Sequence, residues 1–232
     1  MSNTIVGIHQ PNFFPWLGFF EEILKSDVFV LLDNVQYSRG SWTNRVQIVN
    51  QNKPSWITCP VNHTGKYQTI REIKIDDNQP WRKQIKKIIK INYLKSDLFS
   101  ENFEFISDMI DQRESMISAF NIKNIEAICN ALDIKTKFIL QSEFSTSKKA
   151  TELNIEITQY VGGTSYICGS GSKNYQDDLK FSENKITLIH QDFVHPYYKQ
   201  RSNADFIGGL SIIDALLNCG IDGTKKLLNQ KN

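Results

Sequence analysis

The sequence predicts an α/β fold in which a single domain spans all 232 residues around a mainly parallel sheet. The chain opens with a short strand, a helix and a second strand, and strands alternate with helices again between residues 137 and 190. Short extended runs between residues 43 and 75 add an antiparallel extension. A helical insertion is expected near residues 81–133.

The first strand-helix-strand unit places two polar residues at one edge of the sheet. Residues 4–8 and 28–32 are apolar, β-branched runs, and residues 16–25 carry apolar side chains at helical spacing. Such units pair their strands in parallel through a right-handed crossover. His9 and Asp33 follow the two strands, so we expect both at the carboxyl edge, where ligands of open α/β sheets bind.

The remaining elements follow from the same patterns. The runs RVQIV, SWITCPV and TIREIKI, separated by polar turns, predict hairpins or a meander. Helices are expected at residues 81–93, 103–117, 122–132 and 148–160, and strands at residues 137–140, 165–168 and 186–190. Ser211 and Asp214 form a Ser-x-x-acid capping box that opens the last helix, and Gly220 is expected to close it.

Composition argues against several classes of protein. The 27 Lys and Arg residues nearly balance 25 Asp and Glu residues. The net charge is therefore too small to attract nucleic acid or an anionic membrane by electrostatics alone. The basic stripe of residues 81–93 lacks interleaved aromatics, which favours a solvated face. The start MSNTIVG lacks a signal peptide, and no stretch approaches the roughly 18 apolar residues of a membrane span. Four cysteines without a CxxC pair favour a cytoplasmic protein with no metal or other cofactor.

The stretch IHQPNFFPWLGFF, residues 8–20, carries the first candidate site residues. Pro11 holds Gln10 extended, so His9 and Gln10 leave the strand end in opposite directions. A neutral imidazole there can take a proton from an amine or hydroxyl, whereas the alternative is a histidine that only caps the sheet. We expect the aromatic side chains, Trp16 included, to form a pocket wall above these two residues rather than plain core.

The segment DNVQYSRGSWTNR, residues 33–45, is rich in planar donors and aromatic rings. Arginine forks bind anions, and tryptophan or tyrosine faces stack on rings. The segment therefore favours recognition of a sugar, a nucleobase or a phosphate, and the alternative is a polar loop leading to an edge strand. The candidate binding residues are Tyr37, Trp42, Asn44 and Arg45.

A glycine-rich turn follows the strand at residues 165–168. Backbone N–H groups in the segment GSGSK can hold a phosphate, with Lys173 as counter-charge and Tyr175 beside it, although no known phosphate-loop motif matches. Cys168 has a second interpretation, as a nucleophile near His190 or His195, but a cysteine at a strand end is usually a packing residue.

The segment HPYYKQ, residues 195–200, has more aromatic and amide side chains than a surface loop requires. Tyr198 and Gln200 either complete the pocket or pack the carboxyl-terminal helix onto the sheet.

Four motifs occur in order from His9 to Gly220: HQPxxFPWxGFF, SDVFVLLDxVQYSxxxWxNR, WxTxPV, and YxQ with LSIIDxLxNxG. Together they resemble the WbqC-like family, whose members are encoded in bacterial O-antigen (lipopolysaccharide) and other surface-polysaccharide gene clusters. The resemblance implies work on a nucleotide-linked sugar, by acyl or aminoacyl transfer such as the addition of glycine to the amine of an amino sugar.

The resemblance also implies roles at the matching positions. His9 and Gln10 would stand at the reacting centre, and Asp33 would orient His9 or the amine. The donor or nucleotide would be held by Trp42, Asn44 and Arg45. Cys59 and Cys168 have no counterpart in the family pattern, so it gives a covalent cysteine no support.

Two other functions stay open at this stage. One is ATP-dependent ligation of an amino acid to the same sugar, with residues 169–173 holding the triphosphate. The other is a non-catalytic protein that binds a sugar nucleotide. The residues do not identify the acyl donor. The candidates are a thioester, a carrier protein, a charged tRNA and an ATP-activated acid. An oligomer is compatible with the aromatic surplus near residues 13–20.

Overall fold

A computed structural model describes residues 3–169, 177–200 and 205–230. The chain forms two compact units, each assembled from three separate stretches. Unit 1 comprises Met1–Gln10, Gly18–Asn34 and Ile134–Val194. Unit 2 comprises Pro11–Leu17, Val35–Asp133 and His195–Asn232. The motif at residues 8–20 therefore contributes to both units.

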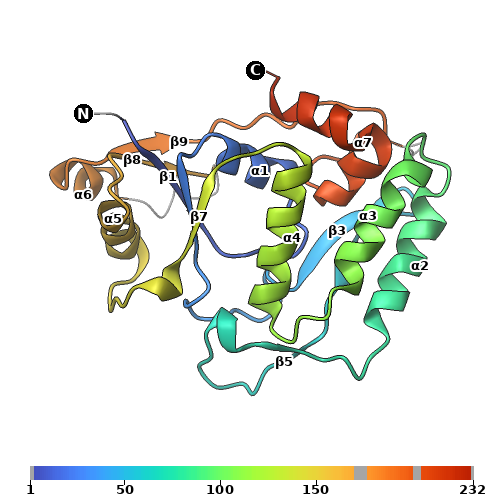
Figure 1. Cartoon of the computed structure of the whole chain (residues 1–232), viewed down its shortest axis with the longest axis horizontal. Helices are drawn as coiled ribbons and strands as arrows, with labels where there is room; N and C mark the ends of the chain where they lie inside the picture. Colours follow the sequence, from blue (N-terminus) through green and yellow to red (C-terminus); the bar gives the residue numbers. More distant parts are fainter. Residues whose placement is uncertain (1–2, 170–176, 201–204, 231–232) are drawn as a thin grey trace. The chain divides into compact units, whose positions relative to one another are not determined.

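Unit 1 is built on a five-stranded parallel sheet with the strand order β7-β2-β1-β8-β9 (Figure 1). This confirms the predicted α/β class and the parallel pairing of the first two strands. The elements of the unit are β1 (Ile5–His9), α1 (Leu17–Leu24), β2 (Val28–Leu31), β7 (Lys137–Leu140), the 3-10 turn η2 (Gln141–Glu143), α5 (Ala150–Tyr160), β8 (Ser165–Cys168), α6 (Asp178–Glu183) and β9 (Thr187–His190).

A glycine in β1 leaves room for the Phe29 ring of β2 and for Ser26, which lies between α1 and β2. A Cβ atom at Gly7 would lie 2.5 Å from the Phe29 ring and 2.6 Å from the Ser26 hydroxyl oxygen. Either distance is a clash, so only glycine fits at this position. The Ser26 hydroxyl donates to the Glu22 carbonyl at 2.8 Å, which provides a hydrogen bond to a carbonyl in the last turn of α1.

Unit 2 contains two small antiparallel sheets and four long helices among its described residues. The β3-β4 hairpin confirms the expected extended region, and α2 and α3 lie side by side (Figure 1). Both antiparallel sheets are separate from the parallel sheet. The elements are β3 (Arg45–Asn50), β4 (Lys53–Thr58), β5 (Val61–Asn62), the 3-10 turn η1 (Ile70–Glu72), β6 (Lys74–Ile75), α2 (Trp81–Tyr93), α3 (Phe99–Asp111), α4 (Ile117–Ala131) and α7 (Ile212–Leu228).

The predicted helix at residues 103–117 was wrong at both ends. Helix α3 ends at Asp111, and the chain then runs extended beside β6. The Ile75 amide donates to the Ser115 carbonyl at 2.9 Å, and the Ile117 amide donates to the Ile73 carbonyl at 3.0 Å. This pairing with a distant segment supplies hydrogen bonds that a longer helix would have made internally.

The last helix also differs from its prediction. Gly220 lies inside α7 with φ 70° and ψ −179°, so it kinks the helix instead of closing it. Ser211 caps the helix as expected, because its hydroxyl accepts from the Ile213 amide at 3.2 Å. Asp214 does not reach back to complete a capping box, because its carboxylate accepts three side-chain hydrogen bonds elsewhere in unit 2.

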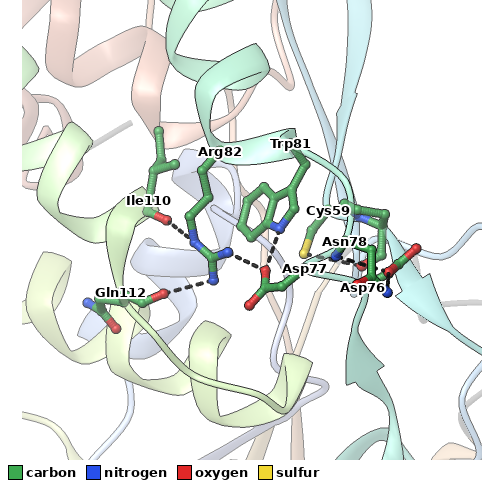
Figure 2. Close-up of polar contacts among 9 residues, drawn as sticks. Cys59, Asp76, Asp77, Asn78, Trp81, Arg82, Ile110 and Gln112 are labelled. Carbon is green, nitrogen blue, oxygen red and sulfur yellow. Dashed lines mark hydrogen bonds and ion pairs between the residues drawn. The ribbon is translucent and has the colours of Figure 1, made fainter.

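Figure 2 shows a buried arginine that links two helices of unit 2. Arg82, in the first turn of α2, donates to the Ile110 carbonyl at 3.0 Å and to the Gln112 carbonyl at 2.9 Å. Asp77 pairs with the Arg82 guanidinium and accepts from the Trp81 indole N–H at 3.0 Å. The basic stripe predicted for this helix is therefore not wholly solvated, because Arg82 caps the end of α3 instead.

The phenylalanines of residues 8–20 are core side chains, which corrects the expectation of a pocket wall. Phe13 and Phe14 are each 0% exposed and contact Phe120 within unit 2. Phe19 and Phe20 are 1% and 0% exposed in unit 1. One short motif thus supplies the aromatic core of two units.

None of the helices in the described ranges is both long enough and apolar enough to cross a membrane.

Candidate active site

The strand order of unit 1 creates a topological switch point between β1 and β8. From β1 the chain passes to β2 and β7 on one side, and it later returns to β8 and β9 on the other. Crossovers on either side of such a point leave a crevice outside the carboxyl ends of the strands, which is where open α/β sheets bind ligands. His9 is the last residue of β1 and therefore lies at this edge.

The surroundings of His9 fix both its orientation and its protonation. Its Nδ1 atom lies 3.1 Å from the Gln10 carbonyl oxygen, which can only accept, so Nδ1 donates and Nε2 keeps its lone pair. The ring packs edge-on against Phe19, with 4.9 Å between centroids. Burial lowers the pKa of His9 despite the opposing Gln10 hydrogen bond. A half-buried, neutral imidazole with a defined acceptor nitrogen suits a general base.

Gln10 and Asp33 accompany His9 in unit 1. Gln10 is half-buried and orients the imidazole through its backbone carbonyl. Asp33 is buried, and its Oδ1 atom accepts from the Ser142 amide at 2.9 Å. That hydrogen bond anchors the 3-10 turn after β7, and the predicted role of Asp33 beside His9 or the amine stays a prediction.

A buried acidic pair on α1, missed by the sequence analysis, lies at the same edge. Glu21 pairs with Lys25 and accepts from the side chain of Gln191, which also donates to the Gly18 carbonyl at 2.7 Å. Glu22 is 2% exposed, and its Oε1 atom has no hydrogen-bond partner among the described residues. Burial, and then the neighbouring charge of Glu21, raise the pKa of Glu22 to about 8.

The acidic pair approaches the end of β8. A Cβ atom at Gly169 would lie 3.6 Å from Glu22 Oε2 and 3.7 Å from Gln191 Oε1. The β1-β8 pairing runs as far as Gly7 and Ile167, and the two strands are parallel, so His9 and Gly169 both lie at the carboxyl edge of these neighbouring strands. The spacing of Phe19, Glu22 and Ile23 could have revealed this carboxyl, because Glu22 follows Phe19 by three residues on the apolar face of α1.

Two of the candidate binding residues in unit 2 use their polar groups internally. The Tyr37 hydroxyl donates to Asn44 Oδ1 at 3.0 Å, and Asn44 Nδ2 donates to the Cys59 carbonyl at 3.0 Å. Both side chains are buried. They therefore hold the loop in place, so its exposed side chains are the ones that can contact a ligand.

Trp42 of this loop forms an aromatic platform at the β3-β4 hairpin together with the exposed Trp56 of β4 and the half-buried Arg45. The tryptophans are 45% and 42% exposed, and their ring centroids lie 5.0 Å apart at 53°. The Arg45 guanidinium lies 4.3 Å from the Trp56 ring centroid. Trp56 was not among the predicted residues. The register that pairs it with Gln47, two residues from Arg45, explains its place on this face.

Tyr198 and Gln200 converge on Asp214 in unit 2. The Tyr198 hydroxyl donates to Asp214 Oδ2 at 2.7 Å, and Gln200 Nε2 donates to the same oxygen at 2.9 Å. Trp16 is half-buried and stacks on His195, with 6.4 Å between centroids. Of the two alternatives for this segment, the geometry matches packing of the carboxyl-terminal helix.

Lys173 and Tyr175 lie outside the described residues, so their predicted role at a phosphate turn stays a prediction. Across the described ranges, no group of three or more His, Cys, Asp or Glu side chains is arranged to hold a metal ion.

Comparison with known proteins gives a consistent relationship across nearly the whole chain. A model of the WbqC-like protein family matches residues 10–226. The chain is also 30% identical over 220 residues to "Uncharacterized protein Rv1507c" of Mycobacterium tuberculosis (strain ATCC 25618 / H37Rv), and the alignment covers 94% of each protein. No solved structure matches the chain.

Proposed function

The chain belongs to the WbqC-like protein family, and we propose that it is an N-acyl or aminoacyl transferase. Its acceptor is a nucleotide-linked amino sugar, and the product enters the cytoplasmic stage of bacterial surface-polysaccharide synthesis. The observation that carries this proposal is the neutral His9 imidazole at the switch point of a parallel sheet, with Nε2 available to accept a proton.

The mechanism assigns one proton transfer to this residue. The sugar amine attacks an activated carbonyl, and His9 takes a proton from the amine as the bond forms. The Gln10 side-chain amide and backbone N–H groups at the strand edge hold the developing oxyanion. A lowered pKa favours this role, because the imidazole stays neutral at the pH of the cell.

Replacing His9 with alanine should lower kcat/KM for acyl transfer by roughly a hundredfold or more, since that is the usual contribution of a positioned general base. In the wild type, the acidic limb of the pH-rate profile should lie below about 6.5, because activity is lost only when the imidazole is protonated. His63→Ala is the matched control, and a similar loss in both variants would argue against the role of His9.

The platform of Trp42, Trp56 and Arg45 supports the sugar-nucleotide part of the proposal. Exposed aromatic faces stack on nucleobases and sugar rings, and a guanidinium beside them pairs with phosphate. The two units are tested by separate measurements. Turnover tests the role of His9 in unit 1, and ligand affinity tests the role of the platform in unit 2.

Replacing Trp56 with alanine should weaken binding of the sugar nucleotide about tenfold, because stacking on one aromatic ring contributes about 1–3 kcal/mol. The ligand is first chosen by a thermal-shift screen of UDP, dTDP and their amino sugars. Affinity is then measured by isothermal titration calorimetry. Tyr67→Ala removes another exposed aromatic side chain of unit 2, one outside the platform, and should leave affinity unchanged. Equal affinity in wild type and Trp56→Ala would remove the platform from the proposal.

A further inference from the structure

A thiol and an imidazole meet at the carboxyl ends of β8 and β9. Cys168 and His190 are the last residues of these strands and are direct register partners. The Cys168 Sγ atom lies 3.5 Å from His190 Nδ1. On the other side of the ring, His190 Nε2 lies 3.8 Å from the carboxylate of Asp178, the first residue of α6. All three residues belong to unit 1.

Cys168 is as buried as Cys129, each 1% exposed, and it differs from the other cysteines in having an imidazole beside its sulfur. Burial raises the pKa of Cys129 to about 12 and that of Cys219 to about 11, and it raises the pKa of the Cys59 thiol further. Such thiols stay protonated and unreactive at neutral pH. Cys168 has instead an imidazole in contact with its sulfur, the arrangement by which cysteine enzymes generate a thiolate.

The position of this pair in the sheet also favours chemistry. β1 and β8 are neighbouring parallel strands, so their last residues, His9 and Cys168, lie at the same carboxyl edge of the sheet. Glu22, whose buried Oε1 atom has no hydrogen-bond partner among the described residues, lies close to Gly169, the residue after Cys168. An acyl group bound at this edge would lie beside the ends of both strands, one carrying the candidate nucleophile Cys168 and the other the candidate base His9.

We propose that Cys168 is a nucleophile, activated by His190, that accepts the acyl group as a thioester before the amine takes it. This inference rests on the proposed acyl transfer and defines its donor class, an acyl group with a good leaving group such as a thioester or an acyl adenylate.

The reaction balances in two half-steps. In the first, His190 takes the thiol proton while sulfur forms a bond to the acyl carbon. The bond to the leaving group breaks, and His190 returns the proton to that group. In the second, the sugar amine forms a bond to the same carbon and gives its proton to His9. The carbon-sulfur bond breaks, His9 releases its proton to solvent, and the thiolate takes up a proton from solvent, which restores both the neutral imidazole and the thiol.

Alkylation by iodoacetamide, mapped to each cysteine by peptide mass spectrometry, tests the thiol without any substrate. At pH 6.5, Cys168 should react at least tenfold faster than Cys219, which is the internal control. Its rate should fall at least tenfold in His190→Asn, with an unchanged melting temperature. His190→Gln serves as the second variant if the first fails to fold. A Cys168 rate no faster than that of Cys219, or one unaffected by loss of the imidazole, would overturn the inference.

The activated ester p-nitrophenyl acetate tests acyl transfer to the same atom. We expect one hydroxylamine-sensitive acetyl group on Cys168 in the wild type, and none at residue 168 in Cys168→Ser. Undiminished sugar acylation by Cys168→Ser would overturn this inference and leave the proposed function intact. A reactive, acetylated Cys168 in a protein that modifies no amino sugar would contradict the proposed function and leave the nucleophile in place.

Discussion

Replacing Asp214 with alanine should lower the free energy of unfolding by about 3–5 kcal/mol, as expected when one partner of a buried polar network is removed. Asp214 is 0% exposed and accepts from the hydroxyl groups of Tyr93 and Tyr198, each at 2.7 Å, and from Gln200 at 2.9 Å. Burial raises the pKa of Asp214, although these hydrogen bonds oppose the shift.

The network also explains why Asp214→Ala should lower the free energy of unfolding by more than the contribution of a single hydrogen bond. The Tyr93 hydroxyl accepts from the Val49 amide at 2.9 Å, so it joins β3, α2 and α7. Removal of the carboxylate leaves the buried Tyr93 and Tyr198 hydroxyls without their acceptor and removes one of the two acceptors of the half-buried Gln200 amide. Chemical denaturation measures the loss, and Asp222→Ala, an exposed position on the same helix, should change stability by less than about 0.5 kcal/mol. Equal effects of the two substitutions would show that the network contributes little.

Replacing Glu22 with glutamine should make the protein more stable at alkaline pH, by an amount on the order of 4 kcal/mol near pH 8.5 relative to pH 5. Burial and the Glu21 charge raise the pKa of Glu22 from 4.5 to about 8, so the folded state keeps a proton that the unfolded state has lost. Between these values, stability of the wild type falls as pH rises. Glutamine carries no such proton, so the variant avoids this loss.

The measurement is the free energy of unfolding in urea at several pH values. Below pH 4.5 the carboxyl is protonated in both states, so the difference between Glu22→Gln and wild type should be constant there. It should grow in favour of the variant up to about pH 8 and then level off. Glu183→Gln, at an exposed position of unit 1, should follow the wild type throughout. A pH-independent difference for Glu22→Gln would mean that the Glu22 carboxyl ionises normally in the folded protein.

Local sequence patterns predicted the parallel sheet well, for reasons that the structure makes plain. The strands at residues 137–140 and 165–168 have their predicted bounds, because short apolar runs between polar turns have few alternatives inside an α/β protein. The edge position of His9 followed from the same reasoning, since it depends only on where β1 ends.

The errors arose where distant segments decide the structure. Residues 112–116 leave the helical pattern because β6 offers them hydrogen bonds, and no local signal marks that pairing. The same limit hid part of the candidate site. Trp56 joins Trp42 through the hairpin register, and Glu22 meets Gly169 only because β8 returns beside β1. Gly220 carries a helix-ending residue type, but the chain resumes the helix after its kink.

The proposed acyl transfer is tested most directly by its product. Purified protein is incubated with UDP- and dTDP-linked amino sugars together with acetyl coenzyme A, glycyl-tRNA, or ATP plus glycine, and the sugar nucleotides are analysed by mass spectrometry. We predict that one sugar nucleotide gains one acyl or glycyl group on its amine, at a rate that falls at least a hundredfold in His9→Ala. Tight binding of a sugar nucleotide with no modified product from any donor would contradict the account and leave a binding protein in its place.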